Sequence, residues 1–158
     1  MKVVANTTPL ISLASIGRLD LLRQLFGTIA IPYAVYREIK AKPSFGFNEV
    51  EQDWIEILPV NEKPFPSLLF QKLDLGEAET LLLAKEINAD RVLVDEQMGY
   101  QVAKSIGLIP VRTLSLLLVA KQKGYIPNIK PLLQDMVLKG RWYSQSVCHE
   151  ILEKAGES

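Results

Sequence analysis

Cysteine and histidine are almost absent from this chain. Its 158 residues include one cysteine, Cys148, and one histidine, His149. A lone cysteine excludes an internal disulfide and is typical of a reducing compartment. The two residues are neighbours in a predicted helix, where adjacent side chains diverge, so a Cys–His nucleophile pair is not expected. A zinc site of the usual kind is also not expected, because it needs several Cys or His ligands.

Long apolar runs and an excess of one charge are missing too. The longest largely apolar run, residues 114–120, is far shorter than the roughly 20 residues that span a bilayer, and no signal peptide is evident. We therefore expect a cytoplasmic protein without a membrane segment. Lys and Arg together number 18, as do Asp and Glu. This balance argues against a protein held to nucleic acid by a basic surface alone, but it allows an enzyme that acts on nucleic acid through a small site.

Glycine-rich phosphate loops are also absent after the predicted strands, which argues against a nucleotide-binding fold of the usual type. Short apolar runs instead alternate with helical patterns. We predict strands at residues 3–5, 28–31, 54–58, 91–94 and 109–111, and helices at 10–16, 18–26, 33–40, 76–87, 97–106, 114–123, 131–138 and 144–155. Continuous apolar strands suit a parallel sheet buried on both faces. The expected fold is therefore α/β: one domain over residues 1–158, built as a three-layer α/β/α sandwich with a parallel sheet of four to five strands.

Polar residues at the predicted strand ends are the first candidates for a site, because ligands of open parallel sheets bind beyond the carboxyl ends of the strands. Asn6 follows the first strand, and Asp95 and Glu96 follow the fourth. These two ends are neighbours if the strand order reverses between them. Asp95 could bind a cation or cap the helix that begins near Gln97. Asn6 could bind a ligand, cap a helix or hold a turn.

Further acids lie on predicted helices. Glu38 would be an ordinary solvated surface residue unless its side chain points to the same end of the predicted sheet as Asp95. Asp74 and Glu77 have the spacing of a capping box, which alone would explain both. Glu77 and Glu79 lie two residues apart and point to different sides of a helix, so at most one should join a site. Together Glu38, Glu77 and Asp95 would form an oxygen-rich site suited to Mg²⁺ or Mn²⁺, ions that position water and offset charge on a phosphodiester.

Five segments carry a resemblance to a known family: VVANTTPLISLASIGRLDLL, IPYAVYREI, LDLGEAETLLLA, RVLVDEQMGYQVAKSIGL and LLVAKQKGYIP. In this order and spacing they resemble the PIN-domain-like family, in the branch related to VapC-type toxins of prokaryotic toxin–antitoxin pairs. The resemblance covers almost the whole chain. It implies a parallel sheet flanked by helices, and an acidic site that holds Mg²⁺ or Mn²⁺ and cuts single-stranded RNA. It also implies a homodimer and a small antitoxin protein as partner.

The resemblance also assigns site residues. The family's acids fall on position 6, Glu38, Glu77 and Asp95, with Glu96 beside the last. Thr7 or Thr8 matches the small hydroxyl residues that follow the first acid. The expected metal ligands are Glu38, Glu77 and Asp95. Thr7 and Glu96 are expected to lie next to the ion.

Asn6 is the departure from the family's pattern, because that position usually carries aspartate. Asparagine keeps one carbonyl oxygen but has no negative charge. At an effective dielectric of about 20, a unit charge roughly 4 Å from a cation is worth on the order of several kcal/mol before desolvation. Two functions are therefore expected as alternatives: a metal-dependent endoribonuclease, or a PIN-like binding protein with a weakened site that acts through a protein or RNA partner.

Overall fold

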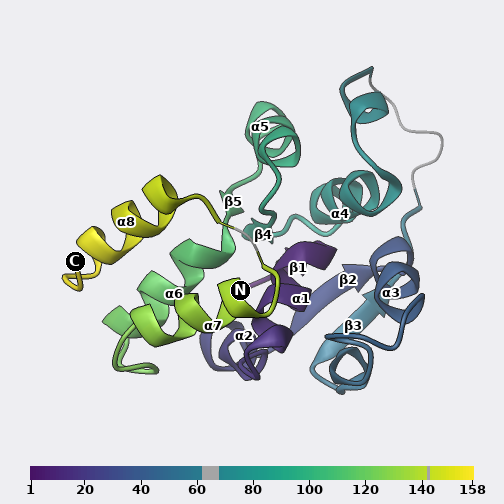
Figure 1. Cartoon of the computed structure of the whole chain (residues 1–158). Coiled ribbons are helices and arrows are strands. Elements are labelled where there is room, and N and C mark those ends of the chain that lie inside the picture. Colours follow the sequence, from purple (N-terminus) through teal and green to yellow (C-terminus); the bar gives the residue numbers. More distant parts are fainter. Residues whose placement is uncertain (62–67, 142) are drawn as a thin grey trace.

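The computed structural model describes residues 1–61, 68–141 and 143–158 (Figure 1). Five strands in this part of the chain form one parallel sheet in the order β3–β2–β1–β4–β5. They are β1 (Val3–Ala5), β2 (Ile29–Pro32), β3 (Ile55–Leu58), β4 (Arg91–Leu93) and β5 (Pro110–Val111). The order reverses between β1 and β4, which pair with each other. The predicted parallel sheet is confirmed, and the order does reverse between the first and fourth strands, which was the condition for their ends to be neighbours.

Helices cover both faces of this sheet. They are α1 (Thr7–Ser15), α2 (Asp20–Phe26), α3 (Tyr33–Lys40), α4 (Leu75–Glu86), α5 (Gln97–Ser105), α6 (Thr113–Gln122), α7 (Lys130–Leu138) and α8 (Gln145–Lys154), with short 3₁₀ helices at Glu49–Glu51 and Leu68–Lys72. Figure 1 shows α4 and α5 above the sheet, and α1, α2, α6 and α7 below it. The predicted three-layer arrangement is confirmed. No helix in the described ranges is long and apolar enough to cross a membrane.

The strands are buried on both faces because successive side chains alternate between two cores. Val3 and Ala5 of β1 pack into the core that α1 and α6 share, together with Leu93 of β4. Val4 points the other way and packs with Val92 into the core under α4 and α5. Because both faces are covered by helices, the strand ends are the place where a polar site can form.

The start of α1 differs from the prediction. The helix begins at Thr7, directly after the strand tip, whereas the sequence predicted a start at Leu10. Pro9 therefore lies in the first turn, where its missing N–H has no partner to lose. Asn6 occupies the position before the helix in an extended conformation, and its side chain makes no capping hydrogen bond. Its amide oxygen is consequently not used to begin α1.

Candidate active site

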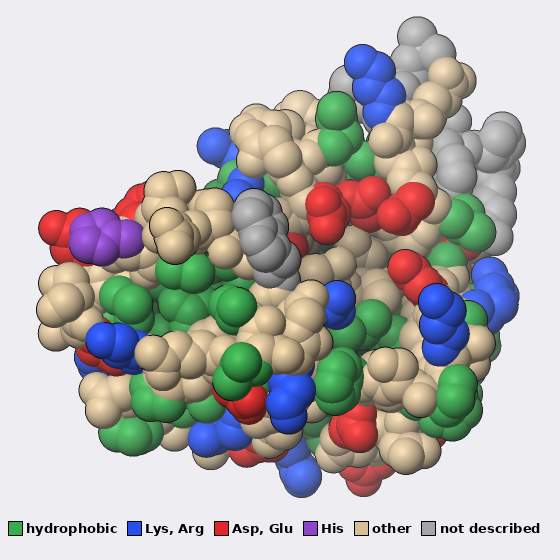
Figure 2. Space-filling model, viewed as in Figure 1, with side chains coloured by type: hydrophobic (Ala, Val, Ile, Leu, Met, Phe, Trp, Pro, Cys, Tyr) green, Lys and Arg blue, Asp and Glu red, His purple; other side chains and the backbone are tan. Residues whose placement is uncertain are grey.

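A cavity of about 470 Å³ lies where the strand order reverses, beyond the carboxyl ends of β1 and β4. The Asn6 N–H donates to the Leu93 carbonyl at 2.9 Å and joins the two strand ends. The lining residues come from separate segments: Asn6, Thr7, Thr8, Glu38, Asp74, Glu77, Glu96, Gln97 and Met98. Figure 2 shows acidic side chains gathered in a hollow of this face. Except for Asp95, the structure brings all the site residues predicted from the sequence to this one cavity.

The Asn6 side chain is buried at the bottom of the site, with 4% of its surface exposed. Its Oδ1 atom has no hydrogen-bond partner among the described residues. Buried polar atoms are nearly always paired, because an unpaired one costs about 1–3 kcal/mol. Asn6 Oδ1 is therefore available to a donor or a cation that enters the cavity.

Glu38 reaches the same cavity from α3. The Thr7 hydroxyl donates to Glu38 Oε2 at 2.8 Å, so the first turn of α1 orients this carboxylate. A Cβ on Gly76 would stand 2.9 Å from Glu38 Oε2 and 3.5 Å from Asn6 Oδ1. The missing side chain at Gly76 thus makes room for both oxygens. Glu38 is solvent-exposed, as one interpretation of the sequence expected, but it also points to the strand-end pole.

Glu77 has two roles at the start of α4. Asp74 Oδ1 accepts the Glu77 N–H at 2.8 Å, and Glu77 Oε1 accepts the Asp74 N–H at 3.3 Å, so the predicted capping box is confirmed. This arrangement uses only one Glu77 oxygen. Glu77 Oε2 is buried without a partner in the described part of the chain, and it lies 2.9 Å from where a Cβ on Gly99 would stand. The capping residue therefore also presents a free oxygen.

The electrostatic surroundings of Glu77 disfavour its charge. Burial raises the pKa of Glu77 from 4.5 to about 7; the backbone hydrogen bond from Asp74 opposes this shift, while the charges of Asp74 and Glu96 add to it. A bound cation would reverse this balance, because it favours the charged carboxylate.

Glu79 lies outside the cavity, which confirms that Glu77 and Glu79 diverge. It is only 2% exposed, and its Oε1 accepts the Ala34 N–H at 3.1 Å. Ala34 is in the first turn of α3, so this bond ties α4 to α3. Glu79 thus positions the two helices that carry Glu77 and Glu38.

Asp95 faces away from the acidic cavity. Its Oδ1 accepts the Thr113 N–H at 2.7 Å, and its Oδ2 accepts the Thr113 hydroxyl at 2.8 Å. Asp95 therefore caps a helix, but it caps α6 and not the helix after Gln97. It lines a different cavity, of about 360 Å³, beside Arg112. Burial raises the pKa of Asp95, and the hydrogen bonds from Thr113 oppose the shift.

Glu96 points to the opposite side from Asp95 and lines the acidic cavity. It stands immediately before α5 in an extended conformation, and its side chain makes no capping hydrogen bond. Its exposed carboxylate is therefore free to meet a ligand. The two neighbours diverge because successive side chains of an extended chain alternate in direction.

The donor set fits a hydrated divalent cation. Within the described ranges, no group of three Asp, Glu, His or Cys side chains lies close enough together to hold an ion alone. Two buried oxygens without a partner in those ranges, Asn6 Oδ1 and Glu77 Oε2, nevertheless belong to residues that line the acidic cavity. Mg²⁺ commonly uses one or two protein carboxylates and keeps several waters, so it does not need a complete protein cage.

Several features of this site were not assigned from the sequence. Gln97 and Met98 line the cavity because α5 begins just after the end of β4. Neither glutamine nor methionine indicates a functional site by its residue type. Gly76 and Gly99 were detectable. A glycine inside a helix costs about 1 kcal/mol relative to alanine, which indicates that another group approaches closely at that position.

The fold and the site together define a class of protein: a parallel α/β sheet with helices on both faces and an acidic cavity at the switch point of its strand order. A family model described as a PIN domain matches residues 2–157. The chain therefore belongs to the PIN-domain family, as its motifs predicted. PIN domains have a nuclease-type function, bind nucleic acid and in general depend on divalent metal. No curated protein matches the chain.

Proposed function

We propose that this PIN-domain protein is a metal-dependent endoribonuclease that cuts single-stranded RNA. The observation that carries the proposal is a pair of buried oxygens at an acidic cavity, Asn6 Oδ1 and Glu77 Oε2, which have no hydrogen-bond partner in the described part of the chain. The resemblance to the VapC-type branch supports a more specific role as the toxin of a toxin–antitoxin pair. From that branch we also propose a cytoplasmic homodimer that binds a small antitoxin protein.

We assign Glu38 and Glu77 as the carboxylates that would hold Mg²⁺ or Mn²⁺, with Glu96 as the third acid. Glu96 replaces Asp95 in this assignment because both Asp95 oxygens accept hydrogen bonds from Thr113. When bound, the ion supplies positive charge against the phosphodiester and lowers the pKa of a water. The chain itself holds the acids in place: the Thr7 hydroxyl fixes one oxygen of Glu38, and the capping box fixes one oxygen of Glu77.

A second candidate function is a PIN-like binding protein whose cleavage site is weakened. It is favoured by the neutral Asn6 buried at the bottom of the site and by the lack of a three-acid cluster in the described ranges. Such a protein would act by holding an RNA or protein partner.

Asn6→Asp separates the two functions. It restores a charge beside the cavity, so we expect Mn²⁺ affinity, measured by calorimetry, to rise at least tenfold, which is about 1.4 kcal/mol. Asn128→Asp adds the same charge at an exposed position before α7 and is the matched control. Cleavage of a single-stranded RNA by the parent with Mn²⁺, abolished by Glu77→Gln, supports the endoribonuclease.

Cleavage by the Asn6→Asp variant alone would instead support the weakened binding protein. If neither protein binds Mn²⁺ or cuts RNA, the ribonuclease proposal is wrong.

A further inference from the structure

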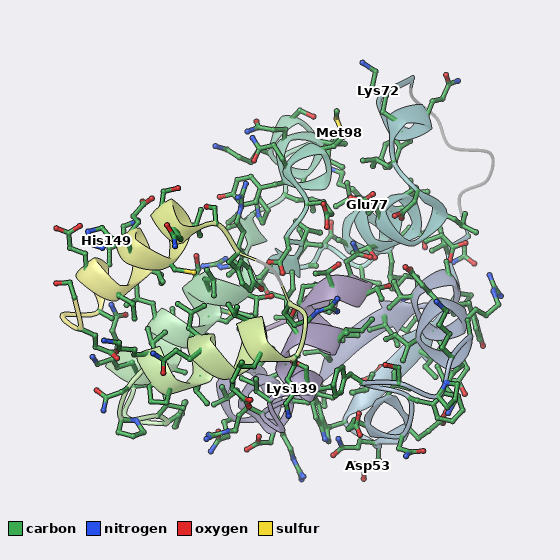
Figure 3. The ribbon with its side chains drawn as sticks, viewed as in Figure 1. Asp53, Lys72, Glu77, Met98, Lys139 and His149 are labelled. Carbon is green, nitrogen blue, oxygen red and sulfur yellow. The ribbon has the colours of Figure 1, made fainter. Side chains whose placement is uncertain are left out.

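A basic cavity adjoins the acidic one. Its volume is about 340 Å³, and Lys42, Lys139 and Arg141 are among its lining residues. Glu38 lines both cavities, which places the basic cavity beside the acidic site. Figure 2 shows Lys and Arg side chains below the acidic group on the same face, and Figure 3 shows Lys139 where α7 ends, below Glu77 in this view. Residues almost 100 positions apart thus bring positive charge to one place.

These cations are available to a ligand. In the described ranges, Lys42 and Arg141 take part in no ion pair or side-chain hydrogen bond, and Lys139 makes only a long, exposed pair with Asp135 at 3.9 Å. An exposed pair of this kind contributes little. Three cations that converge beside a single carboxylate, Glu38, with only one weak ion pair among them in the described part of the chain, indicate an anionic ligand.

The walls of the basic cavity are held in place by the fold. One wall is the loop after α3, and Lys40 Nζ anchors it by donating to the Phe47 carbonyl at 2.8 Å and by lying 3.6 Å from the centre of the Phe47 ring. The other wall follows α7, where the Arg141 N–H donates to the carbonyl of the fully buried Met136 at 2.9 Å. The cavity is therefore formed before any ligand binds.

Phe45 indicates which anion fits. It lines the basic cavity and is 38% exposed, so its ring is open to a stacking partner. A row of cations beside an exposed aromatic ring is typical of surfaces that bind single-stranded nucleic acid. The cations contact the phosphates, and the ring stacks on a base. An acidic peptide would contact the positive charges but would leave the face of the Phe45 ring without a stacking partner.

We infer that this basic cavity holds the backbone of single-stranded RNA beside the scissile phosphate, with Lys42, Lys139 and Arg141 on phosphates and Phe45 on a base. The inference rests on the proposed ribonuclease function for its substrate. It gives the RNA a direction of approach, from the end of α7 past Glu38 into the acidic cavity.

Fluorescence anisotropy with a labelled single-stranded RNA of about 12 nucleotides tests the inference. The buffer contains EDTA, so that binding is measured without cleavage. Lys42→Gln and Arg141→Gln should each lower the slope of log affinity against log salt by about 0.7 and weaken binding roughly eightfold at about 50 mM salt. Phe45→Leu should weaken binding at least fivefold. Lys123→Gln, at the exposed end of α6, is the matched control and should bind as the parent does.

Unchanged affinity and salt slope in both Gln variants would overturn the inference, and so would an absence of RNA binding by the parent. Displacement of the RNA by poly-glutamate at equal charge would assign the cavity to an acidic polypeptide and overturn the RNA assignment. Cleavage with Mn²⁺ is measured separately. If the protein binds RNA through these residues but does not cut it, this inference is supported and the ribonuclease proposal is wrong. If the protein cuts RNA while the variants bind it as the parent does, the ribonuclease proposal is supported and this inference is wrong.

Discussion

Glu77 has a structural role with one carboxylate oxygen and leaves the other oxygen unused. One of its carboxylate oxygens completes the capping box of α4, and the other is buried without a partner in the described part of the chain. The capping role was visible in the sequence because it depends on residues three positions apart. The free oxygen was not, because its burial depends on α5 lying close to it at Gly99.

The raised pKa of Glu77 makes the metal-free protein sensitive to pH. Between the ordinary pKa of 4.5 and the folded value of about 7, the folded chain keeps a proton that the unfolded chain releases. Stability therefore falls as pH rises through this window. We expect the free energy of urea unfolding in EDTA to drop by about 1–3 kcal/mol from pH 5 to pH 8, after allowance for solvent screening. Glu77→Gln should remove this part of the dependence of the unfolding free energy on pH. The same pH dependence in both proteins would contradict its assignment to Glu77.

Gly76 allows the site to be perturbed without removing a charge. In Gly76→Ala the new Cβ would meet Glu38 Oε2 at 2.9 Å and push this exposed carboxylate aside. Alanine also favours the helix by about 1 kcal/mol. We expect thermal stability to be kept or raised while Mn²⁺ affinity falls at least tenfold. Unfolding curves and calorimetry on the same sample check this, and unchanged metal binding would show that Glu38 is not a ligand.

Asp95 and Glu96 have different roles: Asp95 accepts hydrogen bonds at the start of α6, whereas the Glu96 carboxylate before α5 is exposed. Asp95→Ala leaves the Thr113 N–H and hydroxyl at the start of α6 without their acceptor, so we expect a loss of about 1–3 kcal/mol in urea unfolding. Glu96→Gln changes an exposed carboxylate and should alter stability by less than about 0.5 kcal/mol. Mn²⁺ affinity should fall in Glu96→Gln. A fall in metal affinity confined to Asp95→Ala would return the ligand role to Asp95.

Most elements could be predicted from the sequence, because apolar strands and helical spacing are local patterns. The choice between Asp95 and Glu96 could not be made in this way. The acceptor role of Asp95 depends on Thr113, 18 positions later, and on where α6 begins in space. The early start of α1 was missed for a related reason, since Pro9 suggested a boundary although it can occupy the first turn of a helix.

At the scale of the whole molecule, the net charge of zero conceals a separation of charge. Acidic residues line the cavity at the strand ends, and Lys42, Lys139 and Arg141 share the adjoining one. Composition argued only against a broadly basic surface, because it cannot show which charges the fold brings together. The topology supplies this information: the reversal between β1 and β4 places two strand ends from opposite halves of the chain beside each other.

A cation bound at this junction should stabilise the entire fold, because its proposed ligands lie on α3, α4 and the segment after β4. At a Mn²⁺ concentration of 100 times Kd, binding contributes about 2.7 kcal/mol. For a chain of this size we expect the midpoint of thermal unfolding to rise by roughly 5–10 °C. Glu77→Gln should show little of this rise. An equal shift in the variant would place the ion elsewhere.

The bond from the Ala34 N–H to Glu79 has a consequence for which ions the protein accepts. Widening the gap between α3 and α4 would strip a buried carboxylate of a partner, which is costly. This bond should therefore oppose a widening of the distance between Glu38 on α3 and Glu77 on α4. Small ions with strict octahedral preferences tolerate such a fixed frame, whereas Ca²⁺ prefers more ligands in an adaptable one. At the proposed metal site, calcium should therefore be a poor substitute for magnesium or manganese.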